Sequence, residues 1–396
     1  MASRRTLSAE VSAAVADLSR VDADAALARV RSELADMKAR YSAALRSLDA
    51  ERSKSDALAG LQGLDSVGGG VSGRLAHTEA TAVIVLSDWH VEEHVDPATV
   101  SGLNEFTLEI ADRRIAELRN RFSKLVEHER GLAKIDRIVV CALGDFISNI
   151  IHEDTAELAQ LGPLAALRWA GERLRGFVDL ASSLAKEVIV LTSTGNHGRT
   201  TMKPRVATEN EHSFEQHLYL TMAEQEKNRN VRWVISPGYL NTVDLQGFVL
   251  RAHHGHAIRY GGGVGGIAVP ANKAISQWNR AARADLDVFG HWHQWSWINN
   301  RYVSNGSLIG HSAYAVRIKA EYEFPCQSFI VIDHGRNCVT RAMPIFCDKD
   351  LQEKRNGERG EHGRRKRTAE GRGGDEDSGR AGRKAGRGVV RGRRGG

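Results

Sequence analysis

The chain of 396 residues lacks the features that mark membrane and secreted proteins. No stretch approaches the roughly 18 uninterrupted apolar residues that a membrane helix needs. The first 30 residues contain no continuous apolar segment of the kind found in a secretory signal. The four cysteines show no Cys-x-x-Cys spacing, and Cys141 stands inside an apolar run, where a buried free thiol is expected. We therefore expect a reduced, intracellular protein of the cytoplasm without membrane contact.

Excess basic charge is confined to one end of the chain. The net charge is +6, but residues 351–396 contain 15 Lys and Arg against 7 Asp and Glu, a local net charge of +8, so residues 1–350 carry −2. The same end lacks aromatic residues and apolar periodicity, and we interpret residues 349–396 as a disordered Gly- and Arg-rich tail. Its repeated GRR and GRK pieces would attract polyphosphate without regard to sequence, so nucleic acid is an expected partner. A tail that serves only localisation is the alternative.

Residues 1–60 read as a helical segment. They contain neither Pro nor Gly before Gly60, and the apolar residues from Leu27 to Leu48 alternate in steps of three and four. This heptad pattern favours a coiled coil that joins copies of the chain into a homo-oligomer through residues 27–48. A single amphipathic helix lying on the folded domain is the alternative. Residues 61–77 are rich in Gly and Ser, and we interpret them as a flexible linker.

Residues 78–348 have the pattern of a folded domain. Apolar, strand-like runs alternate with helical segments, and this alternation predicts a layered α/β fold. Near the end of the domain, residues 294–308 and 326–346 read as consecutive strands with few helices between them. The predicted strands cover 82–87, 137–143, 187–193 and 247–253, and the predicted helices cover 105–130, 156–184 and 206–226.

Five apolar runs end abruptly in polar residues that bind metals. A buried parallel strand looks like this where it reaches the carboxyl edge of its sheet. Each cluster alone could be a turn with incidental polar residues, but five in succession favour one shared site. The clusters are Asp88 and His90 in "SDWH", Gly144–Asp145, Gly195–Asn196–His197, "HHGH" at 253–256, and Gly290–His291–Trp292–His293.

The residue types in these clusters suit a pair of divalent cations. Two cations can share one bridging carboxylate, with imidazole and carbonyl oxygen ligands around them. Carboxylate, amide and imidazole ligands without thiolate suit Mn²⁺, Fe or Zn²⁺. We therefore expect two divalent metal ions as cofactors, with Mn²⁺ preferred.

The order D-x-H, GD, GNH, H-G-H, GHxH resembles that of the calcineurin-like metallophosphoesterases, including their double-strand-break-repair nuclease branch. The resemblance covers about residues 80–330, and stand-alone enzymes such as those encoded by bacteriophages are the nearer likeness. It implies a layered β-sandwich flanked by helices. It also implies that a hydroxide bridging two metals attacks phosphorus in line, and that His197 protonates the leaving oxygen.

The resemblance also implies a ligand set. Asp145 would bridge the two metals, and His254 is preferred as a ligand because the family ligand directly precedes the glycine, with His253 as its rival. The first metal would be held by Asp88, His90, Asp145 and His293, and the second by Asp145, Asn196, His254 and His291.

One position departs from the family pattern. The family has Asp or Glu after the GNH histidine, whereas this chain has Gly198. That acid orients the imidazole, so His197 would need another acid, and Asp154 or Glu153 is the candidate. Asn149 could be the further polar residue that often follows the GD motif.

Several residues near the motifs are candidates for substrate binding. A guanidinium suits phosphate geometry, and Arg199, Lys203 and Arg205 follow the GNH motif; a solvated basic loop is the alternative. His256 is expected at the rim of the site, and the resemblance places Asn305 near the substrate.

These interpretations converge on a dinuclear metal-dependent phosphoesterase, foremost a phosphodiesterase or nuclease that hydrolyses DNA or RNA. A phosphatase or small-nucleotide phosphodiesterase is the second hypothesis. The third is a non-enzymatic nucleic-acid-binding assembly factor, although the complete ligand set weighs against it.

Overall fold

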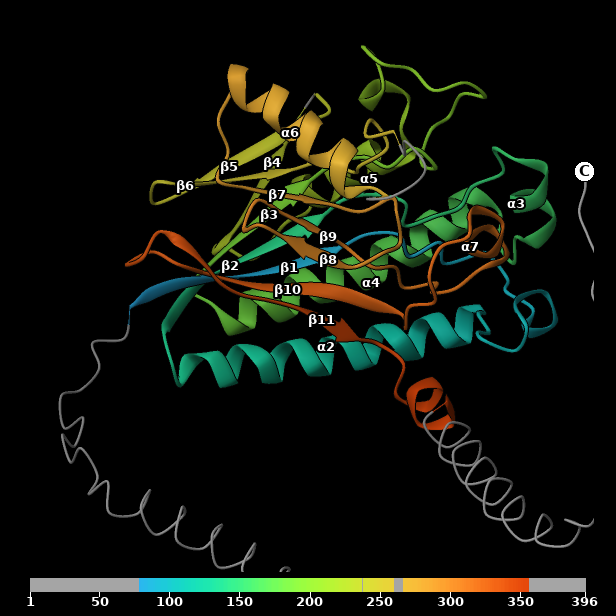
Figure 1. Ribbon diagram of the computed structural model, residues 1–396, viewed down its shortest axis with the longest axis horizontal. Helices are drawn as coiled ribbons and strands as arrows, with labels where there is room; N and C mark the ends of the chain where they lie inside the picture. Colours follow the sequence, from blue (N-terminus) through green and yellow to red (C-terminus); the bar gives the residue numbers. More distant parts are fainter. Residues whose placement is uncertain (1–77, 237, 260–265, 356–396) are drawn as a thin grey trace, which may run out of the picture. The chain divides into compact units, whose positions relative to one another are not determined.

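The computed structural model describes residues 78–236, 238–259 and 266–355 (Figure 1). The predicted N-terminal helix with its heptad pattern, the linker at 61–77 and most of the predicted basic tail lie outside the described residues. Among the helices that the structure describes, none has the length and apolar character to cross a membrane.

A six-stranded sheet forms the centre of the described chain, in the order β11-β10-β1-β2-β3-β4. The strands β1 to β4 run parallel to one another, and β10 and β11 extend the sheet in antiparallel register. The strands are β1 (Glu79–Leu86), β2 (Lys134–Ala142), β3 (Glu187–Thr192), β4 (Val231–Ile235), β10 (Cys326–Asp333) and β11 (Cys338–Phe346).

A second sheet has five strands in the order β5-β6-β7-β9-β8. The pairs β6–β7 and β7–β9 are parallel, while β5–β6 and β8–β9 are antiparallel. The strands are β5 (Asn241–Leu245), β6 (Phe248–Ala252), β7 (Leu286–Phe289), β8 (Ser296–Ile298) and β9 (Tyr302–Ser304).

The two sheets pack face to face between layers of helices. Along β1, Ala82, Ile84 and Leu86 pack against helices, whereas Val83 and Val85 pack against the second sheet. This alternation follows from the two-residue period of a strand, and it explains why a strand buried on both faces is apolar throughout. The helices are α2 (Leu108–Arg130), α4 (Pro163–Leu184) and α5 (Phe214–Glu224) on the first sheet, α6 (Ala268–Ala281) on the second, and the short α3 (Glu153–Leu158) and α7 (Ala313–Ile318) (Figure 1).

The layered α/β prediction is confirmed, and two predicted helices need correction. The segment predicted as one helix over 156–184 is divided into two: α3 ends at Leu158, and α4 starts only at Pro163, with Gly162 as its N-cap. The helix predicted over 206–226 begins only after Ser213, whose side chain caps α5 by accepting a hydrogen bond from the Gln216 amide. Parallel β1, β2 and β3 therefore end at one edge of the first sheet, where the polar clusters follow.

Candidate metal centre

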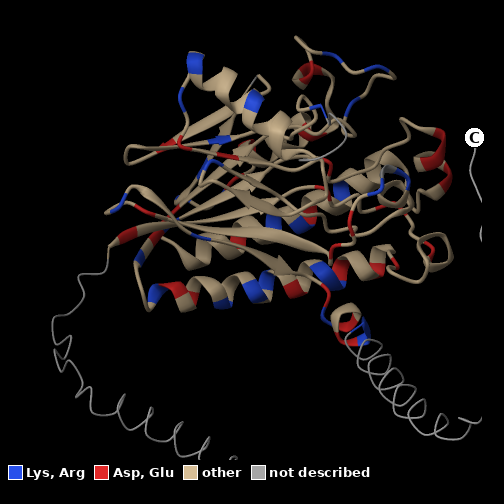
Figure 2. Ribbon diagram, viewed as in Figure 1, with Lys and Arg blue, Asp and Glu red and all other residues tan. Residues whose placement is uncertain are grey.

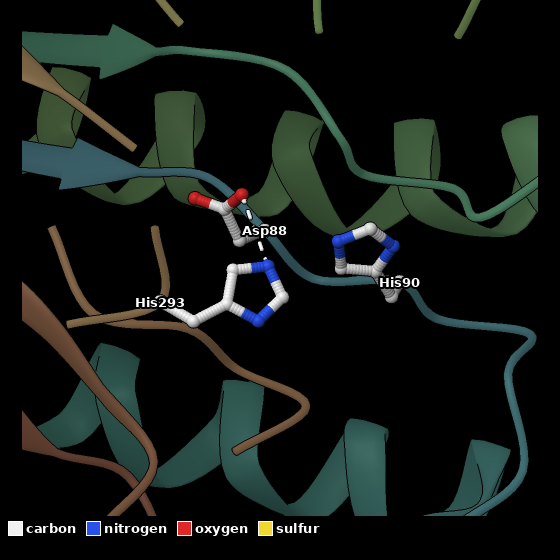
Figure 3. A group of neighbouring side chains, drawn as sticks. All are labelled: Asp88, His90 and His293. Carbon is white, nitrogen blue, oxygen red and sulfur yellow. Dashed lines mark ion pairs between the residues drawn. The ribbon is translucent and has the colours of Figure 1, made fainter. Parts of the chain in front are cut away.

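Two groups of candidate ligands lie beyond the ends of the strands. Each residue of a group offers one ligand atom, and the three ligand atoms of a group all lie within 4.8 Å of one another. Figure 3 shows the first group, in which Asp88 and His90 come from the segment after β1 and His293 from the segment after β7. The first group is Asp88, His90 and His293, and the second is Asp145, His254 and His291.

In the first group, Asp88 is fully buried and faces His293, with 3.4 Å between Asp88 Oδ1 and His293 Nε2 (Figure 3). Burial lowers the pKa of His293, but the bond to Asp88 and its charge outweigh burial and raise that pKa above its ordinary value. The Asp88 carboxylate also accepts the backbone amide of His291, at 3.0 Å from both oxygens. This contact ties the last motif to the first.

The second group centres on Asp145. Its Oδ2 lies 2.8 Å from His254 Nε2, and its Oδ1 accepts the backbone amide of His197 at 2.7 Å. Burial opposes ionisation of Asp145, yet the nearby His254 and His197 hold its pKa well below the ordinary value. In return, the Asp145 carboxylate raises the pKa of His254 to about 10 against the effect of burial. The proton on His254 therefore balances the charge of Asp145, and a bound cation would replace that proton.

Hydrogen-bond partners of Nδ1 determine which ring nitrogen of His254 and of His90 can face a metal. His254 Nδ1 lies 2.7 Å from the Leu143 carbonyl, which can only accept, so Nδ1 carries the hydrogen and Nε2 is left as a ligand atom. Ser148 Oγ donates to Glu93 at 2.8 Å, so His90 Nδ1, at 2.9 Å from Ser148 Oγ, must donate to it. Such outer partners orient metal-binding imidazoles.

Buried atoms without partners test whether a metal would fit. His90 Nε2 and Asn196 Oδ1 are buried and have no hydrogen-bond partner among the described residues. An unpaired buried polar group is costly, so each such group calls for an explanation. One cation at each group would satisfy these two atoms, and the carboxylates of Asp88 and Asp145 supply the compensating charge. The residues present therefore fit a metal pair.

The candidate ligands also share an uncommon backbone conformation. Five of them have a positive φ: Asp88 (56°), His90 (47°), Asp145 (51°), His291 (69°) and His293 (55°). Residues with side chains rarely adopt this left-handed region, although Asp, Asn and His tolerate it best. Residues in this conformation persist only where the surrounding fold holds them in place, and they are often found at functional sites.

His197 lies beside the first group and, like His90, lines a cleft in the surface. Its Nδ1 is 2.9 Å from the backbone carbonyl of Ser148, so Nδ1 donates and Nε2 is the other proton-carrying position. Among the described residues, neither Asp154 nor Glu153, the predicted acid partners, accepts a hydrogen bond from this ring; the Ser148 carbonyl does so. Asn149 holds the loop instead, donating to the carbonyls of His197 and Arg199 at 2.9 and 2.8 Å.

The structure separates the three histidines of the "HHGH" segment. His254 joins the second group, while His253 stacks on Phe289 and lies 3.6 Å from Asp287. His256 pairs with Glu209 at 2.7 Å. Two-residue alternation at the end of β6 explains why neighbouring histidines face different surroundings.

Two of the predicted substrate-binding residues have hydrogen-bond partners inside the protein. The Arg199 guanidinium donates to backbone carbonyls of its own loop, including Asn196 O at 2.6 Å, and so supports the loop. Asn305 is fully buried, donates to Ser87 Oγ at 2.9 Å and accepts from Ser328, and Ser87 in turn donates to Asp88 at 2.5 Å. Asn305 thus lies beneath Asp88. Lys203 and Arg205 lie on the exposed part of the loop.

A cleft of about 750 Å³ opens onto both groups. It is lined by His90 and Asp145 as well as by Tyr314 and Arg317 of α7, which the sequence patterns did not single out. The two α7 residues are three positions apart and therefore share one helix face. Tyr314 is 57% exposed although it is aromatic, and it lies at the cleft. This position marks it as a candidate for substrate binding, and it becomes visible only in the folded structure.

Comparisons with known proteins leave the family unassigned. No family model matches the sequence, and no curated protein matches it. Similar solved structures include Vps29 of Chaetomium thermophilum (9% identity, 68% of this chain and 100% of that chain, TM-score 0.29) and the hypothetical protein PH1004 of Pyrococcus horikoshii (10%, 69% and 92%, 0.34). A phosphatase of Mycoplasma pneumoniae is similar at 10% identity over 70% of this chain and 97% of that chain, with a TM-score of 0.31. These values are too low to carry an argument about activity.

Proposed function

We propose that this protein is a dinuclear metal-dependent phosphoesterase of the calcineurin-like type, and that its substrates are phosphodiesters of DNA or RNA. The observation that carries the proposal is the pair of Asp–His groups lining one cleft, with buried ligand atoms that have no other described partner. Ordered motifs in the sequence and left-handed backbone at five candidate ligands support it independently.

The bound cations would supply Lewis-acid stabilisation of charge on the phosphate oxygens and activation of water. Asp88 with His90 and His293 would hold one cation, and Asn196 with His254 and His291 the other, with Asp145 between them. Mn²⁺ is the cation we propose. The chain's own residues do the positioning: Ser148, Leu143 and Asn305 hold the ligands from behind.

His197 is the proposed general acid. Its Nδ1 donates to the Ser148 carbonyl, so Nε2 is the ring atom that would donate a proton to the leaving oxygen. His197 lines the cleft beside His90, with 4.9 Å between the ring centroids. Proton donation from this position would complete the hydrolysis of the ester bond.

Charge in the cleft implies that substrate binding depends on the metals. Glu93, Glu153 and Asp154 line the cleft together with Asp145, and Figure 2 shows the acidic residues along α3 in red. Carboxylates repel phosphate; Arg317 in the same lining offsets part of this repulsion, and divalent cations at the two groups would offset the rest. We therefore infer that a phosphoester enters the cleft only after metal binding.

The same acidic wall favours a second candidate function. A long nucleic acid would pass more carboxylates than a small phosphoester would, so a phosphatase or small-nucleotide phosphodiesterase is the alternative. The predicted basic tail favours nucleic acid, since its net charge would attract a polyphosphate chain.

One assay distinguishes the candidates. The full chain is incubated with Mn²⁺ and either labelled single- and double-stranded DNA and RNA or bis-p-nitrophenyl phosphate. Cleavage of nucleic acid supports the proposal, and cleavage of the small diester alone supports the alternative. Metal binding without turnover of any substrate would indicate a non-enzymatic assembly factor. Asp145→Asn should abolish turnover, whereas Asp136→Asn, a half-exposed control on β2, should not.

A further inference from the structure

Glu215 of α5 reaches two of the ligand segments with one carboxylate. It is fully buried, its Oε1 accepts the amide of Phe146 at 2.8 Å, and its Oε2 accepts the amide of Gly195 at 2.7 Å. Phe146 directly follows Asp145, and Gly195 directly precedes Asn196. A single side chain therefore fixes the backbone next to a candidate ligand in each of two loops.

The two loops that contain Asp145 and Asn196 lie in direct contact with each other. A methyl group at Gly195 would overlap the Asp145 side chain, so the backbone of one loop lies against the ligand of the other. Burial and the nearby Asp145 raise the pKa of Glu215 to about 8, while the two donated amides lower it. The two amide hydrogen bonds favour the ionised carboxylate, which is the form that can accept from both loops.

Gly198 shows where the carboxylate lies relative to the GNH segment. A Cβ atom at position 198 would lie 2.8 Å from Glu215 Cγ and 2.9 Å from its Cδ and Oε2. The space just after His197 is therefore filled by a carboxylate that comes from α5. This contact explains the glycine at the position where the sequence departs from the pattern it resembles.

We propose that Glu215 is a positioning residue, whose carboxylate clamps the Asp145 and Asn196 loops at the spacing that metal binding requires. The inference rests on the proposed function, because it assigns a role in holding the metal ligands. It concerns a residue that touches neither the metals nor the substrate.

The first test uses Glu215→Gln, which keeps the shape of the side chain. Its amide group must face one of the two backbone N–H groups, so one hydrogen bond becomes a repulsion. We expect the dissociation constant for Mn²⁺, measured by calorimetry on the full chain, to rise about 10- to 100-fold. The matched control is Glu129→Gln, a buried glutamate paired with Arg341 away from the site, which should leave Mn²⁺ binding unchanged.

The second test separates positioning from general support of the fold. Glu215→Ala removes the carboxylate, and Gly198→Asp alone collides with Glu215, so each variant should bind Mn²⁺ more weakly. In the double variant, the aspartate side chain occupies the space that the glutamate vacates and can accept the same amides. We expect the double variant to regain most of the lost affinity and activity.

The outcomes separate the inference from the proposed function. If the wild type binds Mn²⁺ and Glu215→Gln binds it with the same affinity, the positioning role of Glu215 is contradicted, but the proposed function is not. The same holds if the losses of Mn²⁺ affinity in the two single variants add in the double variant. A wild-type chain that binds no divalent cation would overturn both. If Glu215→Ala fails to fold, Glu215→Gln and its control still decide the question.

Discussion

Individual residues at the candidate metal centre combine a side chain that could bind a metal with a strained backbone. Asp88 and Asp145 each have a left-handed φ, and each anchors a neighbouring loop through its carboxylate. Strain of this kind costs of order 1–3 kcal/mol per residue. The hydrogen bonds around the two carboxylates offset that cost, and a bound cation would offset it further. The fold therefore holds these candidate ligands in a fixed arrangement.

The three histidines at 253, 254 and 256 give a prediction at this scale. His254→Ala should lower turnover by more than about 100-fold, beyond the range typical of outer partners of a metal, and His256→Ala by less than about 10-fold. His253→Ala should lower the free energy of unfolding by about 2–5 kcal/mol while sparing Mn²⁺ binding, because it empties space beside Phe289. Steady-state hydrolysis, calorimetry and urea unfolding measure these effects. Greater loss of turnover in His256→Ala than in His254→Ala would contradict the ligand assignment.

At the scale of elements, the short helix α7 forms one wall of the cleft. Tyr314 and Arg317 line it, and a base of a nucleic acid could stack on the exposed tyrosine ring. Tyr314→Ala should raise KM for single-stranded nucleic acid by about 5- to 150-fold, the factor equivalent to the stacking free energy of one base. KM for bis-p-nitrophenyl phosphate should change much less.

Val316→Ala is the matched control on the same helix, because Val316 is exposed and does not line the cleft. Equal effects of Tyr314→Ala on both substrates would argue against base stacking.

The contact between α2 and the chain after β11 gives a pH prediction. Arg114 and Asp348 are buried 2.7 Å apart, and the guanidinium also donates to the Leu308 and Ile309 carbonyls. Burial raises the pKa of Asp348, but Arg114 outweighs burial and holds that pKa below its ordinary value. The pair therefore stabilises the fold above the unfolded pKa of about 4, and this stabilisation is lost as pH falls through the folded value.

Asp348→Asn should lower the free energy of unfolding at pH 7 by about 3–5 kcal/mol, because it leaves Arg114 buried without a counter-charge. The difference from wild type should narrow below about pH 4, where the wild-type carboxyl becomes protonated. Urea unfolding at a series of pH values measures it. A difference that does not change with pH would show that the charge of Asp348 is not responsible.

How much of the molecule the sequence predicts differs between elements. The apolar run of β1 predicts a buried strand because both of its faces are covered, and the polar residues after it predict the edge where the groups meet. The role of Asn305 could not be predicted, since its partner Ser87 lies 218 positions away. The role of Glu215 could not be predicted for the same reason: it belongs to α5, and its partners, Phe146 and Gly195, belong to loops far away in the sequence.

At the scale of the whole molecule, charge is divided between the folded part and the end of the chain. Figure 2 shows both signs interspersed along α2. Deletion of residues 356–396 should weaken nucleic-acid binding and reduce its dependence on salt, because fewer counterions are released. Hydrolysis of bis-p-nitrophenyl phosphate should be unaffected. Titrations at several salt concentrations measure the change, and loss of both functions together would contradict this division.

The most direct test of the account is the number of divalent cations that the full chain binds. After treatment with a chelator, calorimetric titration with Mn²⁺ should give two ions per chain in the wild type, and Asp88→Asn and Asp145→Asn should each weaken or abolish binding. Absence of binding, or binding that neither substitution alters, would contradict the claim that these two groups hold a metal pair.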